Sequence, residues 1–166
     1  MPAAWRRRHA TPLARVAIGV AVKRGAPLPD IGSVAAFRQA LLDARAVAYI
    51  DPLSGGSSGV YLARLFERWG IAAQIAPKAV LVPGGLVAQR VVSGEADIAL
   101  QQASEILAVQ GAVLVGLLPD EIQNYTVYAG GVSATARDPA AARAFLDLLA
   151  GDRARAALVE KGMRAP

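Results

Sequence analysis

The 166-residue chain has no cysteine and a single histidine, His9. The lack of cysteine excludes disulfides, thiolate catalysis and Cys-ligated metals, and it leaves the redox compartment open. His9 stands in a basic stretch near the start, so the rest of the chain has no imidazole. This argues against a Ser-His-Asp triad and against a His-rich metal site. We expect neither a metal nor a cofactor.

The chain also has few long hydrophobic runs, and beyond its first 24 residues it has no excess of basic side chains. A long uncharged and mostly apolar run, Ile106–Pro119, contains Gln110 and two glycines and is shorter than the ~18–20 apolar residues that span a bilayer. We therefore expect no membrane insertion, although the mean hydropathy is +0.36. The net charge of +5 comes from residues 1–24, which hold six basic and no acidic side chains, whereas the remainder holds 12 basic and 13 acidic ones. We expect no nucleic-acid partner.

The first ten residues are basic, yet no apolar segment of the kind found in signal peptides stands before Arg15. The sequence as written therefore shows no export signal.

The most informative stretch is D-P-L-S-G-G-S-S-G-V-Y, Asp51–Tyr61, which follows the apolar run Ala46–Ile50 and leads into the helical pattern Val60–Trp69. A Gly/Ser-rich turn that opens directly into a helix leaves the first N–H groups of that helix unpaired. The helix dipole adds partial positive charge at the same end. Three hydroxyls of the turn can donate to an oxyanion or cap the helix, namely those of Ser54, Ser57 and Ser58. The stretch predicts an anion site.

An ordinary strand-to-helix turn remains the alternative, because glycine and serine are common turn residues whatever the function. Two phosphate-binding motifs do not fit: no Lys follows the glycines as in a Walker loop, and G-G-S-S-G does not match G-x-G-x-x-G.

The hydrophobic pattern predicts strands at 16–22, 46–50, 78–82, 98–101 and 112–117, an extended segment at 124–132, and helices at 34–43, 59–69, from about 86 to 93, 105–109, 139–150 and 152–161. Strands that alternate with helices through short loops predict an α/β fold with a mostly parallel sheet. In such sheets, ligands gather beyond the carboxyl ends of the strands. Three strand exits, at 51–58, 83–86 and 101–104, are expected to open helices toward one crevice.

Four motifs occur in a fixed order: D-P-x-S-G-G-S-S-G-x-Y at 51–61, V-P-G-G at 82–85, A-D-I-A-L-Q-Q-A-S-E-I-L at 96–107 and Q-N-Y-T-V-Y-A-G at 123–130. In this order they resemble the periplasmic solute-binding proteins of ABC transporters, in particular the molybdate-binding-like type II group. The resemblance extends over about Leu13–Met163.

The resemblance implies a type II periplasmic-binding-protein-like lobe, with hinge strands and two C-terminal helices of an incomplete second lobe. It divides the chain into a basic tail at 1–14, a hinge strand and connector at 15–29, an α/β lobe two at 30–118, and a return hinge strand with the C-terminal helices of lobe one at 119–166. The elements that begin lobe one in that family have no counterpart in this sequence.

The same resemblance carries the family's ligand contacts in lobe two to Ser58, Ala99–Gln102 and Tyr125. With the turn residues, the predicted ligand-binding set is Ser54, Gly56, Ser57, Ser58, Gly84, Gly85, Gln101, Gln102 and Tyr125. The phenol of Tyr125 can donate to an anion, although a half-buried aromatic packed on a strand explains the same position.

Two amide side chains, Gln101 and Gln102, depart from a purely tetrahedral oxyanion site. They could recognise an organic carboxylate or cap the helix that follows. Glu105 is expected to face outward and to form a capping box with Gln102 or stabilise the start of the helix. It is not expected to contact the ligand, because a carboxylate in an anion pocket would repel it.

Two functions remain open, beside a third interpretation as a cytoplasmic ligand-sensing module left after loss of the first lobe. The first is a solute-binding protein that takes up an oxyanion such as molybdate, or a small organic carboxylate, for an ABC importer. The alternative is an isomerase of small polycarboxylic acids on the same scaffold, resembling aconitate isomerase, with Tyr125, Tyr61 or Glu105 moving a proton. Binding is favoured over catalysis because no histidine is available as a base. The resemblance implies the periplasm, while the lack of a visible export signal leaves the cytoplasm open.

Missing lobe-one strands would leave apolar surface without a partner. We expect Val16–Val22, Phe145 and Leu149 to expose such surface and the chain to form a homo-oligomer.

Overall fold

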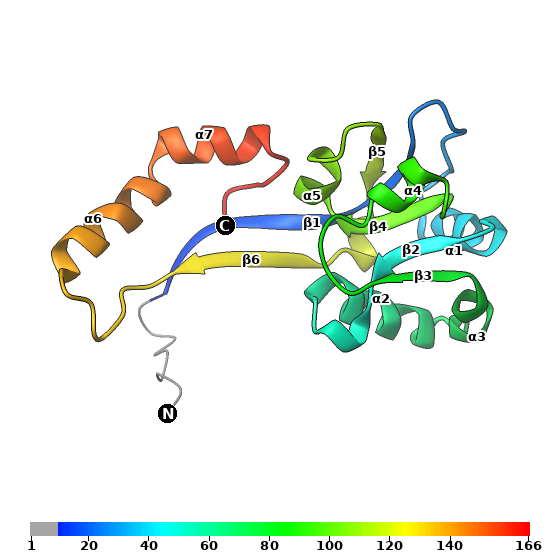
Figure 1. Cartoon of the computed structure of the whole chain (residues 1–166), viewed down its shortest axis with the longest axis horizontal. Helices are drawn as coiled ribbons and strands as arrows, with labels where there is room; N and C mark the ends of the chain where they lie inside the picture. The colour runs from blue at the N-terminus through cyan, green and yellow to red at the C-terminus, as the bar shows by residue number, and fades with distance from the viewer. Residues whose placement is uncertain (1–9) are drawn as a thin grey trace. The chain divides into compact units, whose positions relative to one another are not determined.

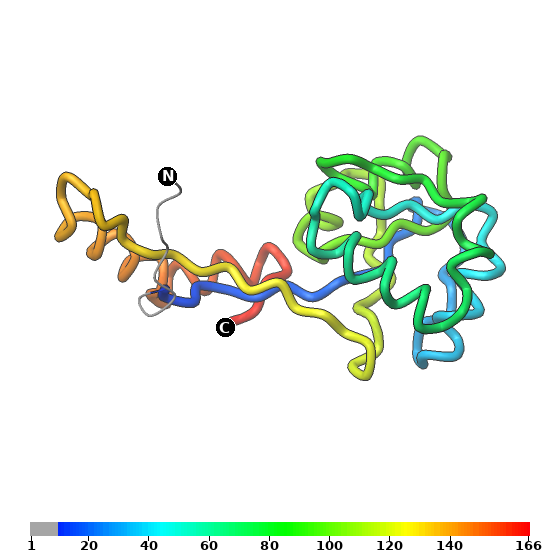
Figure 2. Tube along the Cα trace, turned by 90° about the horizontal axis from the view of Figure 1, so that it is seen from below, coloured from blue at the N-terminus to red at the C-terminus, as the bar shows by residue number. Residues whose placement is uncertain are grey.

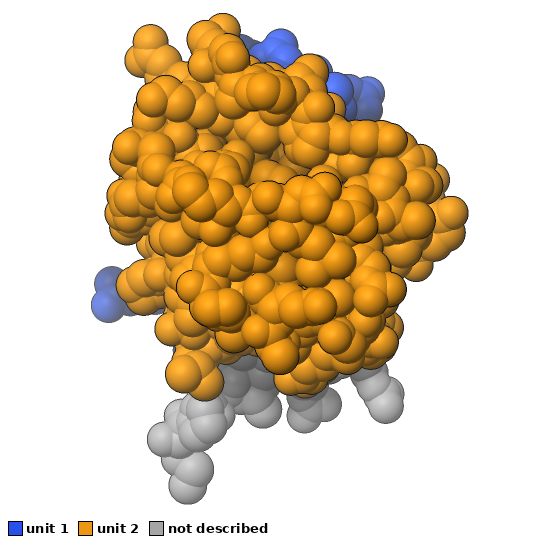
Figure 3. Space-filling model, turned by 90° about the vertical axis from the view of Figure 1, so that its right-hand side faces the viewer, with its two compact units in different colours: residues 1–16, 127–166 blue, residues 17–126 orange. Residues whose placement is uncertain are grey.

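The computed structural model describes residues 10–166, and the chain divides into two compact units (Figure 3). The central unit is Ala17–Thr126. Among the described residues, the C-terminal unit combines 10–16 with Val127–Pro166. The strands β1 (Thr11–Lys23) and β6 (Tyr125–Gly130) contribute residues to both.

The elements of the central unit are, in chain order, α1 (Val34–Asp43), β2 (Val47–Ile50), η2 (Pro52–Ser54), α2 (Ser57–Arg68), α3 (Ala72–Ile75), η3 (Ala76–Lys78), β3 (Ala79–Val82), α4 (Gln89–Ser93), β4 (Ile98–Gln102), α5 (Ala103–Leu107), β5 (Ala112–Leu117) and η4 (Asp120–Ile122). The C-terminal unit holds α6 (Pro139–Ala150) and α7 (Asp152–Glu160).

The sheet has the strand order β3-β2-β4-β1-β5, and β6 pairs with β1 (Figure 1). β2 runs parallel to β3 and β4, whereas β1 runs antiparallel to β4 and β5. Consequently β2, β3, β4 and β5 point in one direction and β1 in the other, which confirms the mostly parallel α/β sheet. Figure 2 shows β1 (blue) and β6 (yellow) running side by side.

Both faces of the sheet in the central unit are covered. On one face, Tyr49 of β2 and Leu100 of β4 pack with Phe37 of α1 and Phe66 of α2. On the other face, alanines of β2 and β4 meet the apolar residues around α4 and Ile106 of α5. Because successive strand residues point to opposite faces, both sides of β2 and β4 are buried, as their continuous apolar runs predict.

Most predicted elements are found within a few residues of their expected bounds. Ser33 caps α1, its Oγ accepting from the Ala36 amide at 3.1 Å, and Gly70 ends α2 at φ 67°, as expected. Three differences stand out: β1 begins at Thr11, the helix expected directly after Gly85 starts only at Gln89, and α3 was not expected at all.

The expectation that Val16–Val22 exposes apolar surface is wrong. Ile18, Val20 and Val22 are at most 3% exposed, because β1 lies inside the sheet between β4 and β5. Phe145 of α6, in contrast, is 59% exposed, as expected. The homo-oligomer stays a prediction.

No helix within residues 10–166 combines the length and apolar character needed to cross a bilayer.

Helix α2 begins in direct contact with the end of β2. Gly59 is buried on Ile50, so that a Cβ at residue 59 would overlap the Ile50 carbonyl oxygen, and one at Gly56 would lie 2.6 Å from Ile50 Cγ2. Both positions therefore need the absence of a side chain, and this close approach fixes where the first turn of α2 lies.

We predict that Gly59→Ala destabilises the protein by at least about 2 kcal/mol, although alanine favours helix by about 1 kcal/mol, because the backbone of β2 cannot move away. The midpoint of urea unfolding, followed by circular dichroism, measures this. Gly84→Ala is the matched control: its Cβ would meet nothing within 4 Å, so its effect should stay within about 0.5 kcal/mol. Equal midpoints for the two variants would contradict the packing argument.

Candidate functional site

The parallel strands β2, β3 and β4 end at one edge of the sheet, which we call the carboxyl edge. Among the helices that follow them, α2 has 12 residues, whereas α4 and α5 have five each. The sequence predicts three helix N-termini at this edge. Only α2 is long enough to have a substantial helix dipole there.

The N-terminus of α2 carries donors without acceptors. Its N-cap is Gly56, which offers no side chain to the first amides. Ser58, one residue into the helix, is 1% exposed, and its Oγ has no hydrogen-bond partner among the described residues. A buried hydroxyl left unsatisfied costs about 1–3 kcal/mol. An acceptor bound at this end would satisfy it.

Three polar side chains from three different segments meet beside this helix end. Ser57 Oγ lies 3.0 Å from Thr126 Oγ1. The amide nitrogen of Gln102 lies 3.0 Å from Ser57 Oγ and 3.4 Å from Thr126 Oγ1. Gln102 is 6% exposed, Thr126 is half-buried and Ser57 is exposed. We call this group the hydroxyl–amide triad.

Gln101, the neighbour of Gln102, points to the opposite face of the sheet. Its Oε1 accepts from the Val87 amide at 2.7 Å and its Nε2 donates to the Gly85 carbonyl at 2.8 Å. Gln101 thereby holds the loop between β3 and α4, in which Gly85 has φ 86°. Ligand contacts by Gln101, Gly84 and Gly85 stay predictions.

Glu105 lies in the first turn of α5. The expectation that it faces outward is wrong. It is half-buried, and its Oε2 is buried without a partner among the described residues. Burial raises the pKa of its carboxyl, and a hydrogen bond from Gln101 opposes part of that rise. The capping role expected for Gln102 is wrong as well, since no side chain caps α5.

The start of β6 is fastened to the central unit by two side chains. Gln123 accepts from the Ile18 amide at 2.9 Å and donates to the Ile18 carbonyl at 3.0 Å. Tyr61 donates its hydroxyl hydrogen to the Ile122 carbonyl at 2.6 Å. These bonds fix the backbone just before Tyr125, which is half-buried at the first position of β6. Its ligand contact stays a prediction.

Ser54 uses its hydroxyl within the turn. Its Oγ donates to the Asp51 carbonyl at 2.7 Å, while Asp51 Oδ1 accepts from the Leu53 amide at 2.9 Å. Ser54 is exposed, and its role as a ligand contact stays a prediction.

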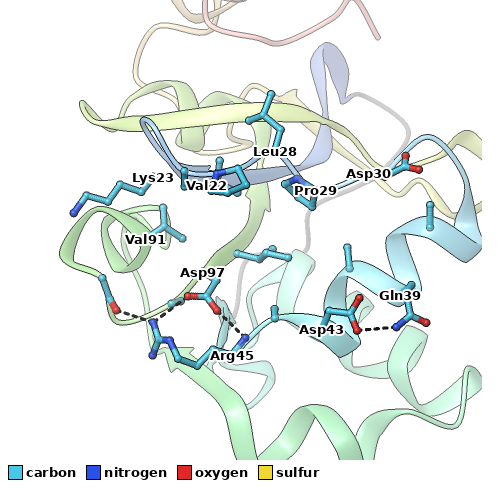
Figure 4. Close-up of a pocket in the computed structure, with 18 residues that line it drawn as sticks. Val22, Lys23, Leu28, Pro29, Asp30, Gln39, Asp43, Arg45, Val91 and Asp97 are labelled. Carbon is cyan, nitrogen blue, oxygen red and sulfur yellow. Dashed lines mark hydrogen bonds and ion pairs between the residues drawn. The ribbon is translucent and has the colours of Figure 1, made fainter.

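A hollow of about 760 Å³ lies elsewhere in the central unit, where β2 and β4 begin (Figure 4). Four of its polar side chains pair with one another: Arg45 donates to Asp97 at 3.0 Å and Gln39 donates to Asp43 at 2.8 Å. None of the predicted ligand-binding residues lines it. We therefore keep the carboxyl edge as the candidate site.

Sequence reasoning missed Thr126 and Gln123 and misplaced Glu105. Thr126 directly follows Tyr125 in the motif Q-N-Y-T, so the signal was present, but only the fold brings this hydroxyl to Ser57. Within residues 10–166, no group of three or more His, Cys, Asp or Glu side chains could hold a metal ion.

The strand order, the paired strands β1 and β6 and the polar carboxyl edge define a lobe of a type II periplasmic-binding-protein-like fold. The chain belongs to the family described as bacterial extracellular solute-binding protein, whose model matches residues 3–164.

A curated relative, an aconitate isomerase from a Pseudomonas species, is 42% identical over 148 residues, which cover 89% of this chain and 55% of the relative. Two solved structures share the fold. The substrate-binding domain of a putative molybdenum ABC transporter from Clostridium difficile has a TM-score of 0.75 at 14% identity, covering 95% of this chain and 67% of that one. The Azotobacter vinelandii periplasmic molybdate-binding protein has a TM-score of 0.69 at 17% identity, covering 96% and 69%. The chain thus spans about half the length of the curated relative.

We predict opposite pH dependences for two glutamates. Folding raises the pKa of Glu105, so the stability linked to its proton is present below its ordinary pKa and lost as the pH rises through the folded value. Glu105→Gln should leave the urea midpoint unchanged in acid and raise it relative to the wild type at neutral pH.

Glu95 is the matched control. Hydrogen bonds from Ser93 and Arg90 lower its pKa. The stability that Glu95 contributes is therefore present above its ordinary pKa and lost as the pH falls. Glu95→Gln should therefore gain no stability at neutral pH, and its small effect should have the opposite sign. Parallel pH profiles for Glu105→Gln and the wild type would contradict the burial of the Glu105 carboxyl.

Proposed function

We propose that the central unit binds a small organic anion bearing carboxylates at its carboxyl edge, and that the protein serves an ABC importer in the periplasm. The observation that carries this proposal is the buried, unpartnered hydroxyl of Ser58 at the uncapped N-terminus of α2. A helix N-terminus that offers free donors stabilises negative charge without a cationic side chain.

Several features favour a carboxylate over a tetrahedral oxyanion. The two solved structures, one named for a molybdenum transporter and one for molybdate binding, are 14% and 17% identical and support the fold alone, whereas the relative at 42% identity is named for aconitate, a small polycarboxylate. The planar amide of Gln102 lies beside the helix end, where it can donate to a carboxylate oxygen.

An isomerase of small polycarboxylic acids is the second candidate. The 42% identical relative supports it, and so does Glu105, whose raised pKa suits a general base better than an ordinary carboxylate would. Tyr61 is a weaker candidate for proton transfer, because its hydroxyl hydrogen is engaged with the Ile122 carbonyl.

We predict that Ser58→Ala weakens the binding of trans-aconitate about 10-fold, because one hydrogen bond to a charged group is lost. Chemical-shift titration of the labelled chain measures the dissociation constant, with citrate, molybdate and sulfate as further probes. Ser93→Ala, which removes an exposed hydroxyl that bonds Glu95 instead, is the control and should bind like the wild type. Molybdate binding without carboxylate binding would replace the proposed ligand class, and no binding of any anion at millimolar concentration would overturn the proposal.

If the second candidate holds, cis-aconitate incubated with the protein in deuterated water should convert to the trans isomer with loss of the methylene proton signal. Glu105→Gln should abolish this turnover while leaving trans-aconitate binding within about threefold, since the substitution removes the base but not the donors at α2. Proton NMR spectra recorded over time measure the reaction. Unchanged spectra with the wild-type chain would leave binding as the sole function.

A further inference from the structure

The hydroxyl–amide triad contains more donor hydrogens than its own contacts can use. Ser57 and Thr126 lie 3.0 Å apart, and one of their two hydroxyl hydrogens forms that bond. The Gln102 amide nitrogen donates into both oxygens rather than accepting from them. The hydrogen of the remaining hydroxyl therefore has no acceptor among the three atoms in contact, Ser57 Oγ, Thr126 Oγ1 and Gln102 Nε2.

The amide of Gln102 has a second hydrogen left in the same way. The three separations of 3.0, 3.0 and 3.4 Å form a nearly equilateral triangle, so the two oxygens lie at an acute angle as seen from the nitrogen. The two N–H bonds of a planar amide diverge far more widely than this. This geometry favours one N–H pointing between the two oxygens, which leaves the other N–H available.

The triad is held in place from three sides. Ser57 opens α2, whose position the contact of Gly59 with Ile50 fixes. Gln102 pairs with Ile18 in the ladder between β4 and β1. Thr126 follows the segment fastened by Gln123, whose side chain bonds both backbone groups of Ile18. Since each member is anchored separately, the triad keeps its geometry without a ligand.

The exposure of the three residues shows from which side a ligand can reach the triad. Gln102 is 6% exposed and lies at the bottom, whereas the hydroxyl of Ser57 belongs to an exposed residue and that of Thr126 to a half-buried one. Surplus hydrogens on the open side favour a partner that only accepts, such as an ionised carboxylate, and disfavour one that brings donors of its own.

We propose that Thr126 determines ligand specificity in this protein, completing with Ser57 and Gln102 a donor triad that selects an ionised carboxylate. This inference rests on the proposed function and extends the site to a residue outside the predicted set. Thr126 acts by direct contact with the ligand, and Gln102 fixes the positions of the two hydroxyl oxygens by donating to them.

Thr126→Val tests the assignment, because valine keeps the branched shape and removes only the hydroxyl. Binding of trans-aconitate to the full chain, measured by chemical-shift titration, should weaken at least 10-fold. Thr126→Ser, which restores the hydroxyl, should bind within threefold of the wild type. The melting temperatures of both variants should stay close to that of the wild type.

Ser57→Ala, alone and combined with Thr126→Val, shows whether the two hydroxyls act together. Because each orients the other's hydrogen, the double variant should lose less affinity than the product of the two single losses. The control is Thr135→Val, which breaks a hydroxyl pair of the same type, Ser133 with Thr135 at 3.0 Å, in the C-terminal unit. It should bind like the wild type.

The outcomes separate this inference from the proposed function. Failure of the wild type to bind trans-aconitate, citrate or any other probe would overturn the proposed function and the triad with it. Wild-type binding combined with unchanged affinity in Thr126→Val would overturn the role of Thr126 alone. A loss of affinity that Thr126→Ser does not restore would also overturn it, because a shape effect would then explain the loss.

Discussion

The close approach of α2 to the end of β2 is the constraint on which the candidate site depends. Gly56 and Gly59 lie so near Ile50 that neither position has room for a side chain. This contact brings the first turn of α2 over the carboxyl edge with its amides uncapped and with Ser57 and Ser58 beside β4. Any residue larger than glycine would push the helix away from the strand and separate these donors from Gln102. The Gly/Ser turn is therefore a packing requirement as well as a source of donors.

The two neighbouring glutamines of β4 form their hydrogen bonds on opposite faces of the sheet. Gln102 reaches the hydroxyls of Ser57 and Thr126, whereas Gln101 holds the loop after β3 through Gly85 and Val87. The alternation of side chains along a strand makes this division unavoidable once both residues end the same strand. Beside Gln101, the half-buried Glu105, whose carboxyl has a raised pKa, suits proton transfer better than passive binding.

The two proposed roles, binding and catalysis, would use the same donors, so both are compatible with one fold. The family assignment, over residues 3–164, supports solute binding, and the aconitate isomerase relative shows how near in sequence an enzyme lies. One fold can host both functions, because a site whose neutral donors hold a carboxylate becomes catalytic once a single base is well placed beside the ligand.

The sequence by itself determined the alternation of strands and helices, the mostly parallel sheet, the cap at Ser33 and the Gly/Ser turn that opens a helix after β2. These features follow from local periodicity and turn chemistry, which neighbouring residues carry. Only the tertiary structure decided that Val16–Val22 is buried, since burial of a strand depends on which strands flank it. It likewise decided that Glu105 is partly buried and that Thr126 meets Ser57 across 69 residues. Such contacts join segments distant in sequence, and no local pattern encodes the register that brings them together.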